Sequence, residues 1–283
     1  MQDGSGVLVS LVIPACDAQP TLARALRSLL AQTCGDWEAV IVSDDLFDYA
    51  GFLAQDGLSD PRWRFVSTGR VRSGCHRARN VGLAATRGAL IGALDADDLL
   101  HPGHLARLAP LALRHGAAAD NLALVLEQSG ATLYRAMGEQ TAPAELGVAE
   151  LLALTAPLVP LVRRDHAAAR LDGIEYAEDV IANLRLIGAL GRLHVVPETL
   201  YEYRVLPGSL AHGDRSAEAF DAAYADYIER LRQGDGFGLP AALWPVAAQG
   251  LADKRALNQA FAAAALADAR LNFQTFVAGR PRP

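Results

Sequence analysis

The sequence has little lysine, little cysteine and no long apolar run. Lys254 is the single lysine among 26 basic residues, and 32 acidic residues bring the formal net charge to −6. A chain with this balance is not expected to bind nucleic acid in general. The three cysteines are scattered and form no CxxC, so neither a disulfide framework nor a thiolate zinc site is indicated.

Other absences narrow the class of protein. No apolar run approaches the roughly 20 residues of a membrane-spanning helix, and the first six residues lack the positive charge of a secretory signal. We therefore expect a cytoplasmic protein. Neither GxGxxG nor GxxxxGK[ST] occurs, which weakens a dinucleotide-binding or P-loop interpretation. With 283 residues, 51% of them hydrophobic, the chain is long and apolar enough for a full core.

Apolar runs and helical patterns alternate through the first half of the sequence. The runs at 7–13, 37–42 and 89–94 predict buried strands. Leucines at helical spacing after Pro20 predict a helix between the first two. Strands and helices that alternate with short links predict a parallel sheet covered on both faces. In such sheets, ligands bind beyond the carboxyl ends of the strands.

The second half is harder to interpret, and its predicted elements are less regular. We expect an alanine-rich helical segment from Asp214 to Phe276. Before it, the pattern predicts strands at 122–127, 131–136 and 157–162, helices at 144–154 and 176–190, and an extended segment at 193–205.

Carboxylates crowd at the ends of two predicted strands. Asp95, Asp97 and Asp98 follow one of them, and Asp44 and Asp45 follow another. Carboxylates this close repel one another unless a cation neutralises them, and their oxygens suit Mg²⁺ or Mn²⁺, which often bridge substrate phosphates. A helix cap or an Asx turn is the alternative for each cluster. Because both clusters belong to one edge of the sheet, we favour a metal and nucleotide site.

Three further residues suggest chemistry. Arg79 lies in an arginine-rich stretch between the clusters, where guanidinium groups suit a diphosphate leaving group. One carboxylate of the pair Glu178-Asp179, near the start of the 176–190 helix, could serve as a general base toward a hydroxyl, although the helix dipole alone also favours acidic residues there. His212 lies in a predicted loop, from which it could reach a metal.

These blocks resemble the family-2 inverting glycosyltransferases of the GT-A fold. The similarity runs from about residue 8 to 105 and resumes more weakly near Glu178-Asp179 and Tyr203-Arg204. Several ordered blocks carry it: Val9-Ser10-Leu11-Val12-Ile13-Pro14-Ala15, Val42-Ser43-Asp44-Asp45, Arg79-Asn80-Val81-Gly82-Leu83-Ala84 and Leu94-Asp95-Ala96-Asp97-Asp98.

The resemblance implies an α/β fold, a GT-A nucleotide-sugar-binding sandwich with a mainly parallel central sheet and a helical C-terminal extension. Residues 1–213 would be the catalytic domain, with a nucleotide-sugar-binding half at 1–116 and an acceptor-binding half at 117–213. Residues 214–283 would be the extension.

The resemblance also implies roles for single residues. Asp179 would be the catalytic base, and Asp97, with His212 as a further ligand, would hold Mn²⁺ or Mg²⁺. The donor nucleotide-sugar would contact Pro14, Asp17, Asp44, Asp45, Arg79, Asn80, Asp95 and Ala96.

The implied function is metal-dependent, inverting transfer of a sugar, with a UDP-sugar favoured, to the hydroxyl of a glycan or lipid-linked acceptor. Such an enzyme would serve cell-surface polysaccharide assembly, and a lipid-linked acceptor would bring it to the inner face of the membrane. A sugar-phosphate nucleotidyltransferase and a non-catalytic nucleotide-sugar-binding module are the alternatives. Two pairs, Cys16-Asp17 and Leu46-Phe47, depart from the family pattern and touch the expected donor pocket.

Overall fold

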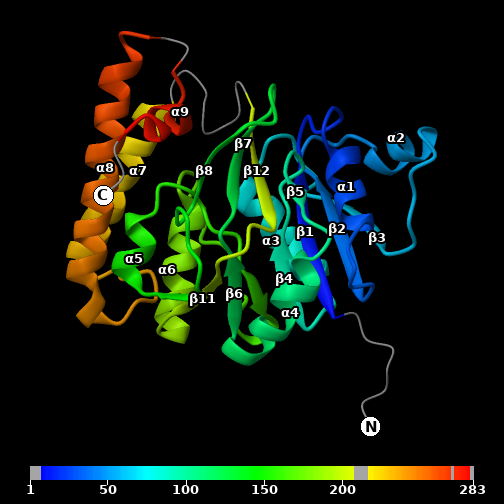
Figure 1. The fold of residues 1–283 in the computed structure, drawn as a ribbon, viewed down its shortest axis with the longest axis horizontal. Helices are drawn as coiled ribbons and strands as arrows, with labels where there is room; N and C mark the ends of the chain where they lie inside the picture. The colour runs from blue at the N-terminus through cyan, green and yellow to red at the C-terminus, as the bar shows by residue number, and fades with distance from the viewer. Residues whose placement is uncertain (1–7, 207–215, 269–270, 281–283) are drawn as a thin grey trace.

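The computed structural model describes residues 8–206, 216–268 and 271–280, which form two sheets and the helices around them (Figure 1). The strands are β1 (Val9–Ala15), β2 (Trp37–Ser43), β3 (Trp63–Ser67), β4 (Leu90–Ala93), β5 (Leu99–Leu100), β6 (Ala117–Asp120), β7 (Ala123–Leu126), β8 (Thr132–Arg135), β9 (Ala144–Leu146), β10 (Leu161–Arg163), β11 (Leu193–Val196) and β12 (Tyr201–Val205). The helices are α1 (Leu22–Leu30), α2 (Tyr49–Gln55), α3 (Cys75–Ala85), α4 (His104–His115), α5 (Val148–Ala153), α6 (Glu178–Leu190), α7 (Ser216–Arg232), α8 (Trp244–Ala265) and α9 (Phe273–Ala278).

The central sheet is mainly parallel. Its strand order is β3-β2-β1-β4-β10-β6-β11-β9, and a smaller sheet has the order β5-β12-β7-β8. In the central sheet, β9 and β10 run antiparallel to their neighbours, whereas the other neighbouring strands pair in parallel. The expected α/β class and mainly parallel sheet are therefore confirmed.

Strand β1 is buried on both faces, which explains its nearly continuous apolar sequence. Leu11 and Ile13 belong to the core that α1 and α4 cover, whereas Val12 packs with Ala78 of α3 on the opposite face. Gly82 allows α3 to approach this closely, because a Cβ atom there would meet a Val12 methyl group at 2.3 Å. The close contact positions the helix that carries Arg79.

The middle of the chain differs from expectation in two places. Strand β6 was not predicted, since its Ala-Ala-Ala-Asp sequence favours a helix, but the central sheet buries it between β10 and β11. The helix predicted at 144–154 is wrong in its first part, where β9 adds to the edge of the sheet before α5 begins. Gly147 lies between them, in an extended conformation. In both places tertiary contacts override local preference.

The C-terminal helices pack against the rest of the molecule. Helices α7 and α8 lie side by side at one end, next to α5 and α6 (Figure 1). Tyr227 and Leu251 share one buried cluster with Leu151 and Ile181, so the extension has a common core with the middle of the chain. The expected boundary at 213/214 lies outside the described residues. Among those residues, no helix combines the length and apolarity that a membrane crossing would need.

A buried carboxylate ties β2 to the segment before β4. Glu38 is 1% exposed and accepts hydrogen bonds from the Ser10 hydroxyl (2.7 Å) and from the backbone N–H (2.6 Å) and guanidinium group (2.8 and 3.0 Å) of Arg87. Burial raises the pKa of Glu38, but these hydrogen bonds outweigh it and leave the pKa below its ordinary value.

Replacing this carboxylate should destabilise the fold. We expect Glu38→Gln to lower the free energy of unfolding at pH 7 by about 2 kcal/mol, because the amide removes the counter-charge of Arg87 and disturbs a buried network. Since the folded-state pKa is lowered, this stabilisation is complete above the ordinary pKa of 4.5 and is lost as the pH falls through the folded value. Urea unfolding would measure the free energy of unfolding of the wild type and of Glu38→Gln at pH 7 and pH 3. The difference between the two proteins should be smaller at pH 3.

The exposed pair Arg135–Glu139 provides a matched control. Glu139 is 87% exposed, so Glu139→Gln should change the free energy of unfolding by less than about 0.5 kcal/mol. Equal losses in both variants would contradict the role of Glu38.

Candidate active site

The two carboxylate clusters lie at one edge of the central sheet. Asp44 and Asp45 follow β2, and the Asp95–Asp98 segment follows β4. Strand β1 pairs in parallel with both of these strands, so the carboxyl ends of all three meet at the same rim. The sheet thus brings together residues that are about 50 positions apart in the sequence, as expected for the ligand edge of a parallel sheet.

At the end of β2, the Asp44 carboxylate is hydrogen-bonded to other residues of the protein. It is 4% exposed and accepts hydrogen bonds from the Thr68 hydroxyl (2.7 Å), the Ser73 hydroxyl and the Gly74 N–H (3.0 Å). These contacts fix the loop that leads into α3. A nucleotide contact by Asp44 stays a prediction, and its carboxylate now also has a clear structural role.

The neighbouring Asp45 is the more accessible of the pair. It accepts hydrogen bonds from the Tyr49 hydroxyl (2.7 Å), the Asp17 N–H (2.8 Å) and the Phe47 N–H (3.1 Å). The last contact is the Asx turn considered as an alternative from the sequence. Burial raises the pKa of Asp45, and the stronger effect of the Tyr49 and backbone hydrogen bonds lowers it below the ordinary value.

The segment after β1 lies beside Asp45. Pro14 sits in β1 opposite Val42, and Asp17 adopts a left-handed conformation with φ of 52°. The Asp17 carboxylate forms an exposed ion pair with Arg72. Ligand atoms of Cys16, Asp17 and Asp45 lie within 4.8 Å of one another. The pair Cys16-Asp17, which departs from the family pattern, is therefore part of this corner of the rim.

Arg79 of α3 connects the β4 end to α6. It forms ion pairs with Asp95 (2.6 Å) and with Glu178, the first residue of α6. Burial lowers the pKa of Arg79, but the Asp95 carboxylate and Cys75 outweigh it and raise the pKa above the ordinary value. Glu178 also pairs with Arg170 at 2.8 Å. This bridge, which sequence reasoning missed, anchors the amino end of α6 beside the strand end.

Asp97 and Asp98 have different surroundings although they are adjacent. Asp98 is 1% exposed and accepts hydrogen bonds from the Tyr201 hydroxyl and the Arg204 N–H, both at 2.7 Å, so it ties the turn to β12. Asp97 is only partly buried. Burial, followed by repulsion from Asp95, raises the pKa of Asp97 to about 6.

A cavity of about 340 Å³ gathers four of the expected residues. Arg79 comes from α3, Asp95 and Asp97 follow β4, and Asp179 comes from the first turn of α6. Ala177, the residue before that helix, has a left-handed conformation with φ of 52°. The volume is in the range of small-ligand sites. Two carboxylates at a strand end, a cation and a separate carboxylate therefore face one space.

Arg79 and Asp179 also line a second cavity, of about 410 Å³. Asn80 lines it, and its side chain exchanges two hydrogen bonds with the backbone of Arg170, at 2.6 and 3.0 Å. Asn80 therefore holds the segment that precedes α6, and its expected donor contact stays a prediction. Ala96 is buried beneath the turn, and His212 lies outside the described residues.

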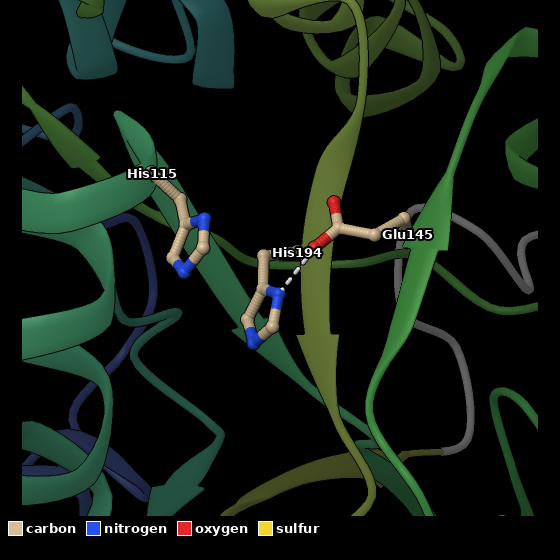
Figure 2. Close-up of side chains that lie close together, drawn as sticks. All are labelled: His115, Glu145 and His194. Carbon is tan, nitrogen blue, oxygen red and sulfur yellow. Dashed lines mark hydrogen bonds and ion pairs between the residues drawn. The ribbon is translucent and has the colours of Figure 1, made fainter.

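Another group of candidate metal ligands lies away from this cavity. His115, Glu145 and His194 come together where β6 and β11 begin, at the opposite edge of the sheet (Figure 2). The two imidazole rings stack at 4.4 Å and are parallel within 3°, and His194 Nδ1 lies 2.5 Å from Glu145. Each nitrogen lone pair lies in the plane of its own imidazole ring, and two parallel planes do not meet, so the two rings cannot both direct a lone pair at one ion.

The site also includes residues that sequence reasoning missed. Helices α7 to α9 complete the cavity with aromatic and polar side chains, and Tyr203 of β12 contributes from the smaller sheet. The one sequence feature that could have indicated this part of the site is that Lys254 is the single lysine of the chain. The lining residues from these helices are Ser216, Phe220, Tyr224, Lys254, Leu257, Asn258, Phe261, Phe273 and Gln274.

The sequence is similar to those of known proteins. Residues 10–145 match the model of glycosyl transferase family 2. The succinoglycan biosynthesis protein ExoO of Rhizobium meliloti (strain 1021) is 32% identical over 227 residues, which cover 72% of this chain and 62% of ExoO. The uncharacterized glycosyltransferase EpsJ of Bacillus subtilis (strain 168) is 28% identical over 226 residues, with the same coverage of both chains. The chain thus spans less than two thirds of these relatives.

Solved structures share the fold. The crystal structure of S. aureus TarS 1–349 in complex with UDP-GlcNAc superposes with a TM-score of 0.66 at 16% identity, and covers 86% of this chain and 71% of that one. A structure of GalNAc-T7 with UDP, GalNAc and Mn²⁺ gives a TM-score of 0.56 at 16% identity, with coverage of 88% and 55%. At this identity the likeness establishes the fold, the GT-A type expected from the sequence.

Proposed function

The chain belongs to glycosyl transferase family 2, and we propose that it transfers a sugar from a nucleoside-diphospho-sugar to a hydroxyl group of a glycan or lipid-linked acceptor. The observation that carries the proposal is the single cavity shared by Arg79, Asp95, Asp97 and Asp179. It combines a cation and paired carboxylates for a diphosphate with a separate carboxylate for a hydroxyl. Polysaccharide assembly is the proposed context, as the name of the relative ExoO suggests.

We favour a UDP-sugar as the donor. Two structural neighbours were solved with UDP or a UDP-sugar, and we assign the base to Asp45, the more accessible carboxylate at the end of β2. The donor contacts proposed for this chain are those expected from the sequence: Pro14, Asp17, Asp44, Asp45, Arg79, Asn80, Asp95 and Ala96. The cytoplasmic location, with an acceptor reached at the inner membrane face, stays a prediction.

The residues around Asp97 fit a divalent cation. Within the described ranges, Asp97 has no cationic side chain at ion-pair distance, and its raised pKa reflects burial beside Asp95. A carboxylate in this state is stabilised by a hard divalent ion, so Asp97 would hold Mn²⁺ or Mg²⁺. When bound, the ion supplies positive charge that neutralises the departing diphosphate.

The reaction follows from the roles of the protein side chains. Asp179 accepts the proton of the acceptor hydroxyl as that oxygen attacks the anomeric carbon from the face opposite the nucleotide. Arg79 is held in place by its ion pairs with Asp95 and Glu178 and would contribute N–H donors to the departing diphosphate. A single displacement inverts the anomeric configuration.

A thermal-shift panel tests the donor class. We expect UDP-sugars to raise the Tm in the presence of Mn²⁺, with a shift that grows as the ligand exceeds its Kd, whereas GDP- and dTDP-sugars do so less. Equal stabilisation without metal would contradict the metal-bridged donor. Release of pyrophosphate from UTP and a sugar 1-phosphate would identify a nucleotidyltransferase instead.

A further inference from the structure

The C-terminal helices bring one cation, Lys254, into the cavity. Lys254 lies in α8, is mostly buried, and lines the same cavity as Asp179. Its Nζ donates a hydrogen bond to the carbonyl oxygen of Leu154 at 2.6 Å. Burial lowers the pKa of Lys254 to about 8, although the nearby Asp179 carboxylate acts in the opposite direction.

Among the residues that the structure describes, none forms an ion pair with Lys254. Arg79, the other cation of the cavity, pairs with Asp95 and Glu178, whereas in the described part of the protein no carboxylate lies within 4.0 Å of Lys254. An ammonium group has three N–H donors, and the Leu154 carbonyl takes one of them. Two N–H donors, and a charge with no ion-pair partner among the described residues, therefore remain for a ligand.

The surroundings of Lys254 suit a sugar ring. Phe220 packs against Tyr176 and Tyr224 with ring centroids 5.3 and 6.2 Å apart, and Phe261 packs against Phe273 at 5.6 Å. All five line the cavity. Aromatic faces bury the apolar face of a small ligand, while a few polar groups fix its orientation. An anionic group on such a ring would complement the ammonium.

We infer that α7–α9 form the acceptor subsite and that Lys254 binds an anionic group of the acceptor, a carboxylate or a phosphate, while the acceptor hydroxyl faces Asp179. The inference rests on the proposed function, because it assigns the acceptor side of the same cavity. Lysine suits this role because it is a compact charge with rotatable donors, whereas arginine presents a wide planar fork. Every other basic residue in the chain is arginine.

A purely structural role for Lys254 predicts a different result. The ammonium would then only cap the carboxyl end of α5 through Leu154. Loss of the cap would lower the Tm but would not change the preference between charged and neutral sugars.

Calorimetry separates these two roles of Lys254. It would measure the Kd of three simple sugars for the protein with UDP and Mn²⁺ present. We expect the wild type to bind glucuronate or glucose 6-phosphate at least about tenfold more tightly than glucose. The tighter of the two anions distinguishes a carboxylate acceptor from a phosphate acceptor. Lys254→Met should remove the preference without weakening glucose binding, and Lys254→Arg should retain part of it.

Arg255→Met is the matched control, because this neighbouring cation pairs with Asp221 and does not line the cavity. The control should keep the wild-type preference. If folded Lys254→Met keeps the preference for anionic sugars, the inference is wrong. It is also wrong if the wild type binds all three sugars equally, and that measurement does not depend on the folding of any variant. Nucleoside diphosphates titrated alone with Mn²⁺ test the proposed function separately. If UDP, GDP and dTDP all fail to bind to the wild type, that function is refuted, whereas intact nucleotide binding without anion preference refutes only the role of Lys254.

Discussion

Replacing Asp179 with asparagine is expected to lower the rate of sugar transfer by a factor of about 10²–10⁴. The amide cannot accept the proton of the acceptor hydroxyl, so the attacking oxygen would remain a weak nucleophile. Asp179 lies in the first turn of α6 and makes no ion pair within the described residues, whereas its neighbour Glu178 holds Arg79 and Arg170. The substitution should therefore leave the fold and the binding of UDP unchanged. Initial rates with a UDP-sugar and an accepting glycan, together with UDP titrations, would measure both effects.

The control for this variant is Asp172→Asn. Asp172 is exposed in the segment that precedes α6 and does not line the cavity. Removal of its charge should leave the rate within about twofold of the wild type. If Asp179→Asn also retained the wild-type rate, Asp179 could not be the base, and the proposed mechanism would be wrong.

Replacing Asp97 with asparagine should abolish the Mn²⁺-dependent part of donor binding and with it most of the activity. An asparagine has no charge with which to hold a divalent ion beside the diphosphate. The same change should raise the stability of the metal-free protein by about 2 kcal/mol at pH 7. The Asp97 carboxylate is partly buried beside Asp95, and its pKa rises from the ordinary 3.8 to about 6 in the folded state. Its charge therefore disfavours folding increasingly as the pH rises from 3.8 to about 6, and fully above that pH.

The adjacent residue offers a contrasting control. Asp98→Asn should lower the free energy of unfolding by about 1–3 kcal/mol, because Asp98 accepts the hydrogen bonds of Tyr201 and Arg204 in a buried position. Where Asp98→Asn remains folded, it should keep its response to Mn²⁺. Thermal unfolding of both variants with and without Mn²⁺ and UDP checks these expectations. A Mn²⁺-dependent donor response that survives in Asp97→Asn would rule out Asp97 as the metal ligand.

Much of the nucleotide side could be predicted because its signals are local. Strands β1, β2 and β4 are buried in the central sheet, so their runs are apolar, and the change to Asp44 and Asp95 marks where each strand ends. The parallel order then follows from short strand–helix alternation. Strand β6 was not predicted because it has no such local signal. Its alanines favour a helix, and only pairing with the neighbouring strands overrides that preference.

The role of each aspartate in the acidic clusters depends on contacts with residues that are distant in the sequence. Asp98 is structural because Tyr201 and Arg204 reach it from β12, more than a hundred residues later. The same holds for Asp44, whose oxygens are taken by the loop before α3. A run of aspartates is chemically uniform as a sequence, and its members acquire different roles only when folding gives each a different set of donors.

The sequence by itself therefore determined the family, the class of fold and the acidic rim of the sheet, because buried strands and strand-end carboxylates leave short, regular patterns. Only the tertiary structure decided that Arg79 joins Asp95 to Glu178, that Asp179 shares a cavity with Asp97, and that α8 contributes Lys254 to it. These relations join segments up to about 175 residues apart, and side-chain packing rather than local preference creates them.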